Sequence, residues 1–477
     1  MKKRNILFII TDQWRYDCLG VNGSKICKTP NLDKLASQGV NFKNAFTTTS
    51  LCSPARAALM TGLYPHNSGI LNNTHEDDAV QRELKEGTRT IAHMLNESGY
   101  NTAYVGKWHV GRALFPKYWG FKNQEGCEDD RESWSNHRKK FTDTKDGEVS
   151  GKALMQKVFL DRNARPLCGV DPVPVEGTLT YLLADIGIKQ IDKLTESSDP
   201  FCLFLSFPGP HYPCIIPEPY ASMYDPKKIP EWPNYKDNFK NKSFVNKKKR
   251  IQWGVDKFTW KEWQHYLAFY FGFITMIDEQ IGRVLNHLKE KGLEDDTIVI
   301  FTSDHGDMAG SHRQFNKSLL MYDETYRIPM IIKWPGEVKK NSSCKDFVSI
   351  IDLMPTLLEF GGAQTPGNLD GRSIAPVLKG KPPKDWPKEV YCEQHGDELG
   401  LYSQRMVRTN DFKYIYNVQD QDELYDLKKD PYEMKNLINN PKYRKTLLKL
   451  EAKLLKWMKK SNDMISQWAG SMLGGRK

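Results

Sequence analysis

Residues 6–13 read Ile-Leu-Phe-Ile-Ile-Thr-Asp-Gln, an apolar run of strand length that ends directly in polar side chains. A membrane span takes about 20 apolar residues, so this run is too short for one. Asp12 also ends the run without the small residues of a signal cleavage site. We therefore predict a first β-strand that is followed at once by Asp12 and Gln13.

The same arrangement recurs along the chain. Further apolar runs of strand length occupy residues 101–105, 201–207, 297–301 and 330–333, and helical patterns occupy residues 31–38, 90–97, 179–196 and 260–291. Gly292 is placed to cap the longest of these helices. Strands that alternate with helices predict an α/β fold, with a large, mostly parallel sheet sandwiched by helices.

Open sheets of this kind place their sites at the carboxyl ends of strands. Polar residues that follow different strands should therefore meet along one edge of the sheet. These residues are Asp12, Gln13, Lys107, His109, His211, Asp304 and His305.

Two long segments interrupt the alternation. Residues 113–175 and 214–260 are rich in Pro, Trp, Lys and Asp, and their periodicity is weak. The second segment contains the basic run Lys-Lys-Lys-Arg at residues 247–250, which indicates a solvated loop or, less often, a contact for an anionic polymer. Loops of this length within a folded domain are commonly functional.

The pattern changes again after about residue 375. Short strand patterns at residues 389–393, 404–409 and 412–417 predict an antiparallel sheet, and a Lys- and Leu-rich helix follows at residues 440–460. We therefore predict a catalytic domain, residues 1–375, which carries both insertions, and a small C-terminal α+β subdomain, residues 376–477.

The composition narrows the choice of partners without naming one. The formal net charge of +10 leaves nucleic acid, an acidic membrane face and a sulfated or phosphorylated substrate all open. The nine cysteines are scattered, with no paired spacing, which argues against a disulfide framework or a zinc site. No apolar stretch reaches membrane length. The cysteine pattern and the lack of a signal cleavage site after the first apolar run lead us to expect a cytoplasmic protein, unless a leader has been removed.

Four of the residues that follow strands have the chemistry of a cation site. Asp12 and Asp304 supply carboxylates, Gln13 supplies an amide oxygen and His305 supplies an imidazole. Oxygen-rich ligation favours Ca²⁺ or Mg²⁺ over Zn²⁺. An Asp that follows a strand can equally cap a helix, so neither Asp alone decides the question.

A stretch outside these strands carries a further signal. Residues 52–62 read Cys-Ser-Pro-Ala-Arg-Ala-Ala-Leu-Met-Thr-Gly, which on its own fits a free cysteine that caps a helix, with Pro54 in the first turn. The stretch also resembles the maturation signature of the formylglycine-dependent (type I) sulfatases, Cys-x-Pro-x-Arg followed by Thr-Gly. The resemblance implies the fold of the alkaline-phosphatase superfamily. It also implies that a formylglycine-generating maturase converts Cys52 to formylglycine (3-oxoalanine), the nucleophile of that family.

Two of the segments that follow strands resemble the metal-binding motifs of the same family. They are residues 11–13, Thr-Asp-Gln, and residues 303–307, Ser-Asp-His-Gly-Asp. The resemblance implies a metal site made by Asp12, Gln13, Cys52, Asp304 and His305. Many members carry Asp in place of Gln13 and Asn in place of His305. Branches with Gln and His include choline sulfatases and phosphonate monoester hydrolases, so this departure leaves the substrate class open.

Further segments are similar to the substrate-handling motifs of the family. They are residues 106–111, Gly-Lys-Trp-His-Val-Gly, residues 208–213, Pro-Gly-Pro-His-Tyr-Pro, and Gly-Ser-His at residues 310–312 with Lys317 beyond it. The resemblance assigns Lys107 and Lys317 to the sulfate oxygens. It makes His109 the base that regenerates the aldehyde and His211 the acid that protonates the departing alcohol.

The resemblance gives two more residues a role. Arg56 would hold the hydrated aldehyde with its fork of donors. Asn73 is a weaker candidate for a contact to the sulfate, and Asn72 is the alternative in its register. Without the motif around it, an Arg on a helix is more simply a surface residue. The C-terminal segments at residues 406–414 and 423–431 also look like those of the family, so the resemblance spans nearly the whole chain.

These residues together predict a sulfatase that hydrolyses a sulfate monoester through a nucleophile at Cys52 and a divalent metal. A sulfated carbohydrate is the expected substrate, because the insertions carry Trp, Tyr and Lys residues that can stack on rings and bind acids. His395 and Arg405 are candidates to reach the same pocket. Two alternatives stay open: a phosphonate or phosphate ester hydrolase of the same superfamily, and a non-catalytic polyanion-binding protein. We expect no nucleic acid or membrane partner, and the oligomeric state is not predicted.

Overall fold

The computed structural model describes residues 3–158, 163–397, 400–418 and 420–474. Its centre is an eight-stranded sheet with the strand order β11-β2-β10-β9-β1-β7-β3-β4. The strands are β1 (Asn5–Asp12), β2 (Val40–Phe46), β3 (Asn101–Gly106), β4 (Asn123–Glu125), β7 (Phe201–Pro210), β9 (Thr297–Ser303), β10 (Met330–Lys333) and β11 (Ser342–Ser349). Only β10 runs antiparallel to its neighbours, β9 and β2. The prediction of a large, mostly parallel sheet is therefore confirmed.

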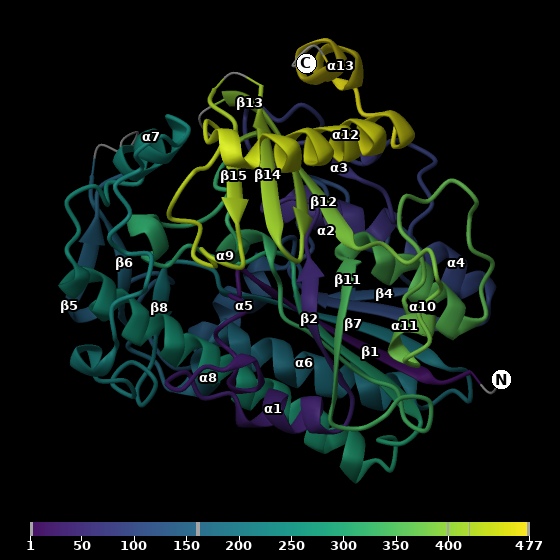
Figure 1. Ribbon diagram of the computed structural model, residues 1–477. Helices are drawn as coiled ribbons and strands as arrows, with labels where there is room; N and C mark the ends of the chain where they lie inside the picture. The colour runs from purple at the N-terminus through teal and green to yellow at the C-terminus, as the bar shows by residue number, and fades with distance from the viewer. Residues whose placement is uncertain (1–2, 159–162, 398–399, 419, 475–477) are drawn as a thin grey trace.

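Helices cover both faces of this sheet, as Figure 1 shows. On one face lie α1 (Pro30–Ser37), α6 (Leu179–Leu194) and α8 (Trp260–Glu290), and on the other lie α2 (Cys52–Thr61), α4 (Ile91–Glu97) and α10 (Leu353–Gly361). The two faces of β1 show why. Leu7 and Ile9 pack with the buried side chains of α1, α6 and α8, and Phe8 packs with those of α2, α4 and α10. The strand is apolar throughout because both of its faces are buried.

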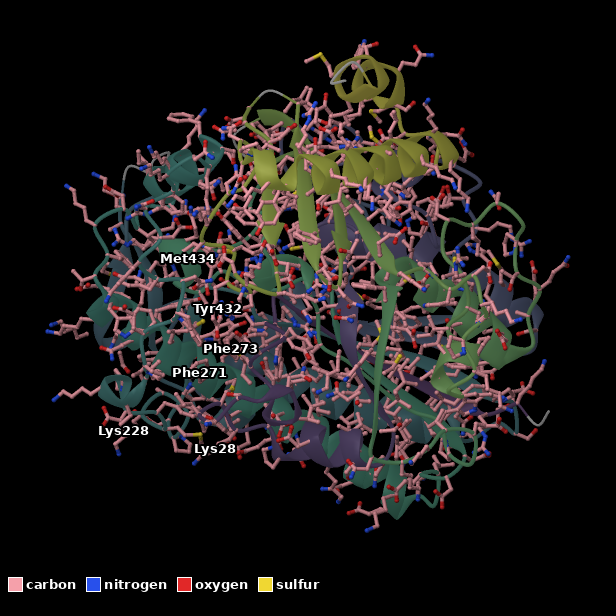
Figure 2. The ribbon with its side chains drawn as sticks, viewed as in Figure 1. Lys28, Lys228, Phe271, Phe273, Tyr432 and Met434 are labelled. Atoms are coloured by element: carbon pink, nitrogen blue, oxygen red, sulfur yellow. The ribbon has the colours of Figure 1, made fainter. Side chains whose placement is uncertain are left out.

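The long helix α8 begins and ends where its sequence dictates. The Thr259 side chain and Glu262 form a capping box at the N-terminus. At the other end, Gly292 takes a φ of 70°, its N–H donates to the Lys289 carbonyl, and the Leu293 N–H donates to the Leu288 carbonyl. This is the Schellman arrangement, so the predicted glycine cap is confirmed. Figure 2 labels Phe271 and Phe273, two of the aromatic side chains that this helix carries.

A buried carboxylate joins α8 to α1. Asp278 is 0% exposed, and its two oxygens accept hydrogen bonds from the backbone N–H groups of Asn31 (3.0 Å) and Leu32 (2.8 Å). These donors belong to the first turn of α1, where no backbone acceptor is available. Burial raises the pKa of Asp278 to about 6, against an ordinary value of 3.8. One side chain of α8 therefore fixes the start of α1 beneath the sheet.

The two insertions form one small sheet. They contribute β5 (Ser150–Gln156), β6 (Arg165–Val170) and β8 (Cys214–Ile216), in that order, together with α5 (Arg131–Arg138) and α7 (Val245–Gln252). The basic run at residues 247–250 lies within α7, and Lys249 is fully buried, with its ammonium group against Asp397. The prediction of a loop there is wrong, because the run is helical and an internal carboxylate binds its third lysine. The predicted exposure to solvent holds for Lys247 and Lys248.

The C-terminal part of the chain forms the predicted antiparallel sheet. Its strands are β12 (Glu389–Asp397), β13 (Gly400–Thr409), β14 (Phe412–Asn417) and β15 (Glu423–Asp426), and α12 (Arg444–Lys460) lies across them, followed by α13 (Ser466–Gly474) (Figure 1). The apolar stripe of α12 is buried, with Leu454 at 0% exposure, so it serves packing. Shorter helices complete the fold: α3 (Pro65–Ser68), α9 (Asp323–Tyr326) and α11 (Ala375–Leu378). Among the described helices, none has the length and apolar character needed to cross a bilayer.

Replacing the linking carboxylate should destabilise the protein. Asp278→Ala leaves two buried N–H groups without an acceptor, and each costs about 1–3 kcal/mol of unfolding free energy. Asp278→Asn keeps one acceptor oxygen and should lose less. Urea denaturation of the two variants beside the parent protein measures the difference, and equal stability of all three would contradict the capping role.

The raised pKa of Asp278 adds a dependence on pH. A carboxyl group whose pKa is higher in the folded state stabilises the fold at low pH, and that contribution is lost as the pH rises through the folded value. The parent protein should therefore lose stability relative to Asp278→Asn between about pH 4 and pH 6. Parallel denaturation curves across this range would show no divergence if the carboxyl group is in fact solvated.

Candidate functional site

The predicted strand ends converge at one edge of the large sheet. Asp12 is the last residue of β1, and Asp304 follows β9, which pairs with β1 in parallel. On the other side of β1, β7 leads into His211, and β3 beyond it leads into Lys107. Parallel strands present their carboxyl ends at the same edge. Residues far apart in the sequence are therefore brought to one place by the strand order alone.

Helix α2 delivers Cys52 to this edge. Every residue of α2 is buried, and Cys52, its first residue, is 1% exposed. Leu51 occupies the N-cap position, so the thiol is not the cap of the helix. The Asn73 side-chain oxygen accepts a hydrogen bond from the Ser53 N–H at 3.2 Å, which ties Asn73 to the start of α2. Asn72 instead binds backbone atoms of its own loop.

Four buried groups around the thiol have the character of metal ligands. They are the carboxylates of Asp12 and Asp304, the Cys52 thiol and the His305 imidazole, and their ligand atoms all lie within 4.8 Å of one another. The Cys52 Sγ lies 3.3 Å from the His305 Nε2 and 3.7 Å from an Asp12 oxygen. Two carboxylates in so small a space fit a divalent cation that prefers oxygen ligands.

Gln13 lies beside this cluster with a strained backbone. Its φ is 69°, in the left-handed region that a residue with a side chain rarely adopts. Its amide oxygen accepts a hydrogen bond from the Lys317 Nζ at 2.8 Å, and its amide nitrogen donates to Asp307. The amide is thus oriented from both ends, and its oxygen is directed toward the cationic side of the cluster.

Positive charges offset the buried acids. The Lys107 Nζ contacts Asp12, and the Lys317 Nζ lies 3.0 Å from the Cys52 Sγ. Burial alone would raise the pKa of Asp12, but the two lysines outweigh burial and hold this pKa well below its usual range. Burial would also raise the pKa of Cys52, and the same lysines with His305 lower it well below its usual value. The site therefore favours a negative charge at residue 52.

Most of the N–H donors of Arg56 bind acceptors within the protein. Its guanidinium donates to an Asp304 oxygen (2.8 Å), the Lys107 carbonyl (2.9 Å) and the Ser206 hydroxyl (2.8 Å). Its Nη2 lies 3.8 Å from Asp12 and has no hydrogen-bond partner within the described residues. Only this nitrogen is left to meet a group formed on residue 52, so Arg56 chiefly orders the site.

Two histidines flank the lysines. The His109 Nε2 lies 2.8 Å from the His75 Nδ1, and burial together with Lys107 lowers the pKa of His109 to about 4. The His211 Nδ1 lies 2.6 Å from the backbone oxygen of the next residue, which makes Nδ1 the protonated nitrogen. Burial, followed by the charge of Lys317, lowers the pKa of His211. Both imidazoles are thus neutral near pH 7 in the protein alone.

Four supporting residues were not predicted from the sequence. Ser206 is a polar residue inside an apolar run, which is a usable signal, and Asp307 lies within a quoted motif but received no role. His75 and Glu128 carry no sequence signal, because their partners lie 34 and 20 residues away. Their positions depend on loops whose course the periodicity does not reveal.

A second acidic cluster lies apart from the first. It consists of His66, Glu393 and Asp463, whose ligand atoms are also within 4.8 Å of one another. Arg405 donates to both Asp463 oxygens (2.5 and 2.9 Å), and His395 lies 3.0 Å from Glu393. This cluster is therefore an internal ion-pair network. His395 and Arg405, which we expected to reach the substrate pocket, make these contacts within the network.

Comparison with known proteins relates this arrangement to one family. The sulfatase family model matches residues 4–363, and the model for the C-terminal part of N-sulphoglucosamine sulphohydrolase matches residues 310–460. An arylsulfatase from Clostridium perfringens is 33% identical, over 95% of this chain and 94% of the relative. A Delta 4,5-hexuronate-2-O-sulfatase from Bacteroides thetaiotaomicron is 30% identical, over 97% and 90%. The crystal structure of a phosphonate monoester hydrolase from Agrobacterium radiobacter is similar with a TM-score of 0.80, at 26% identity over 96% of each chain.

The two acidic clusters should differ in cation binding. Asp304→Asn removes a charge from the Cys52 cluster and should weaken Ca²⁺ or Mg²⁺ binding by about tenfold or more. Calorimetric titration of protein stripped with a chelator measures this. His66→Gln, in the second cluster, is the matched control and should leave the affinity unchanged. The opposite result for the two variants would show that the second cluster binds the cation.

Proposed function

This chain belongs to the sulfatase family, and we propose that it hydrolyses a sulfate monoester of a sulfated carbohydrate, with residue 52 matured from cysteine to formylglycine. The observation that carries the proposal is the buried Cys52 thiol, 3.0 Å from the Lys317 Nζ and 3.3 Å from the His305 Nε2. A relative at 30% identity whose name specifies the 2-O-sulfate of a hexuronate supports the substrate class.

The cations around residue 52 suit the charge of a sulfate ester. Lys107 contacts one oxygen of Asp12, and the Lys317 Nζ lies 3.9 Å from the other oxygen and 3.0 Å from the Cys52 Sγ. Negative charge accumulates on the sulfate oxygens as the ester bond breaks. Two preorganised ammonium groups at this point would stabilise that charge without reorganising.

His211 and His109 would handle the protons. His211 must carry a proton to give to the departing alcohol, yet burial and Lys317 lower its pKa. A bound sulfate group would offset the charge of Lys317, so substrate binding itself favours the protonated form. His109 has a pKa lowered to about 4 and is available to accept a proton near neutral pH.

The cluster also supports the predicted cofactors. Asp12, Asp304 and His305, with Gln13 beside them, would hold Ca²⁺ or Mg²⁺. A bound cation would neutralise negative charge on the oxygens at residue 52. Matured residue 52 would supply an oxygen nucleophile where the gene encodes a thiol.

The buried state of α2 requires the maturase to act before that helix packs, since Cys52 is 1% exposed once the chain has folded.

A phosphonate or phosphate ester hydrolase is the alternative. The structural similarity to a phosphonate monoester hydrolase, with a TM-score of 0.80, is consistent with it. The segment Gly-Lys-Trp-His at residues 106–109 favours the sulfate ester. Turnover of 4-nitrophenyl sulfate and of an aryl phosphonate by the same preparation decides between them. We expect the sulfate to be preferred, and a strong preference for the phosphonate would overturn the proposal.

Cys52→Ala should abolish hydrolysis while the protein still folds, because Ala fits the first turn of a buried helix. Mass spectrometry of the tryptic peptide that contains residue 52 gives an independent readout. In the matured parent protein this peptide should lose one sulfur and two hydrogens and gain one oxygen. Activity in the Ala variant would show that residue 52 is not the nucleophile.

His211→Ala should slow hydrolysis in proportion to how much the leaving group needs a proton. For a sugar sulfate we expect a loss in kcat of about 10²–10⁴, the usual contribution of a general acid. For 4-nitrophenyl sulfate the loss should be much smaller, because nitrophenolate departs without protonation. Equal losses on both substrates would assign His211 to sulfate binding in place of acid catalysis.

A further inference from the structure

A cavity of about 760 Å³ opens beside the site. Its walls come from α5, from the loop that follows this helix and from the first turns of α6. Lys107 and His109 belong to its lining as well as to the functional site. Most of the wall is therefore built by the first insertion, which the family-like motifs do not include.

Lys107 shows that the cavity and the site are continuous. Its Nζ contacts Asp12, and its side chain retains 15% exposure. His109 contacts His75, which lines the cavity too. A sulfate bound by Lys107 would thus present its ester oxygen, and the alcohol attached to it, to the cavity.

One part of the wall is apolar. Leu179, Leu182 and Leu183 of α6 line it, and Phe115 joins them from the first insertion. Trp134 of α5 also lines the cavity and is only half-buried, with its indole N–H directed to Asp146 at 3.4 Å. Its indole ring lies nearly parallel to the His137 ring, with 6.2 Å between the ring centroids. Aromatic rings of this kind pack against the apolar face of a ligand at many binding sites.

The polar part of the wall contains an unsatisfied acceptor. One Glu128 oxygen accepts a hydrogen bond from the backbone N–H of Trp108 at 2.9 Å. The other oxygen is buried and has no hydrogen-bond partner among the residues that the structure describes. A buried carboxylate oxygen without a donor is unfavourable, so such a group favours a ligand that brings one.

We propose that this cavity binds the sugar ring of the departing alcohol, with Trp134 stacked on the ring and Glu128 accepting one of its hydroxyl groups. The inference rests on the proposed function, since it names where the non-sulfate part of that substrate binds. A simple aryl alcohol would satisfy the apolar wall but leaves Glu128 without a donor.

The test compares two substrates with the same reacting group. The first is the best substrate among a panel of monosulfated monosaccharides, and the second is 4-nitrophenyl sulfate, which has no hydroxyl group to donate. Trp134→Ala and Glu128→Gln should each lower kcat/KM for the sugar sulfate by about tenfold more than for the aryl sulfate, chiefly through KM. Trp468→Ala, at a side chain 71% exposed on α13, is the matched control and should change neither substrate.

Equal losses on both substrates, or no loss on either, would overturn the proposal. If the parent protein hydrolyses neither substrate, the proposed function fails and the cavity is tested by binding alone. Calorimetry of Cys52→Ala protein with the unsulfated monosaccharides then decides. Binding that Trp134→Ala weakens by about tenfold would support the sugar site, and an absence of binding would overturn it.

Discussion

The site depends on one buried guanidinium. Arg56 of α2 donates to Asp304 after β9, to the Lys107 carbonyl after β3 and to Ser206 within β7, so a single side chain joins three strands to one helix. A charge this deeply buried is stable only if its partners are correctly placed, because desolvation costs several kcal/mol per ion. The requirement acts in both directions. The strands fix Arg56, and Arg56 fixes the turn of α2 on which Cys52 stands, one helical turn away.

This constraint explains why one cysteine differs chemically from the other eight. All nine cysteines are buried, and burial raises the thiol pKa in Cys18, Cys27, Cys127, Cys168, Cys202, Cys214, Cys344 and Cys392. In Cys52 the same burial is outweighed by Lys107, Lys317 and His305, and the pKa falls. Depth alone would make residue 52 inert. The charges around it reverse the effect of burial, because Lys107 follows β3, His305 follows β9 and Lys317 comes from the loop beyond β9.

How much the sequence could predict follows from the same geometry. Strands such as β1 are continuous apolar runs because both faces are buried, so their ends, and the polar residues that follow them, were predictable. The long helix α8 was predictable from the helical spacing of its apolar residues and from Gly292 at its end. The burial of Lys249 was not predictable, because its partner Asp397 lies 148 residues away and a basic run is usually solvated. The pairing of β6 with β8 was not predictable either, because the two strands belong to different insertions and neither insertion has a clear periodicity.

The boundary between what was predictable and what was not has a functional meaning. Groups that react must be held to within a fraction of an ångström, so most of them lie at the ends of buried strands. Each such end is a short, contiguous stretch of sequence, so its residues can be recognised as a motif. Groups that select the alcohol need only line a cavity of the right shape, and loops can vary there without disturbing the sheet. Glu128 and Trp134 lie in the first insertion, where periodicity is weakest and motifs are absent. A family resemblance carried by motifs therefore indicates the reaction. The choice of substrate depends on segments outside the motifs, such as the first insertion.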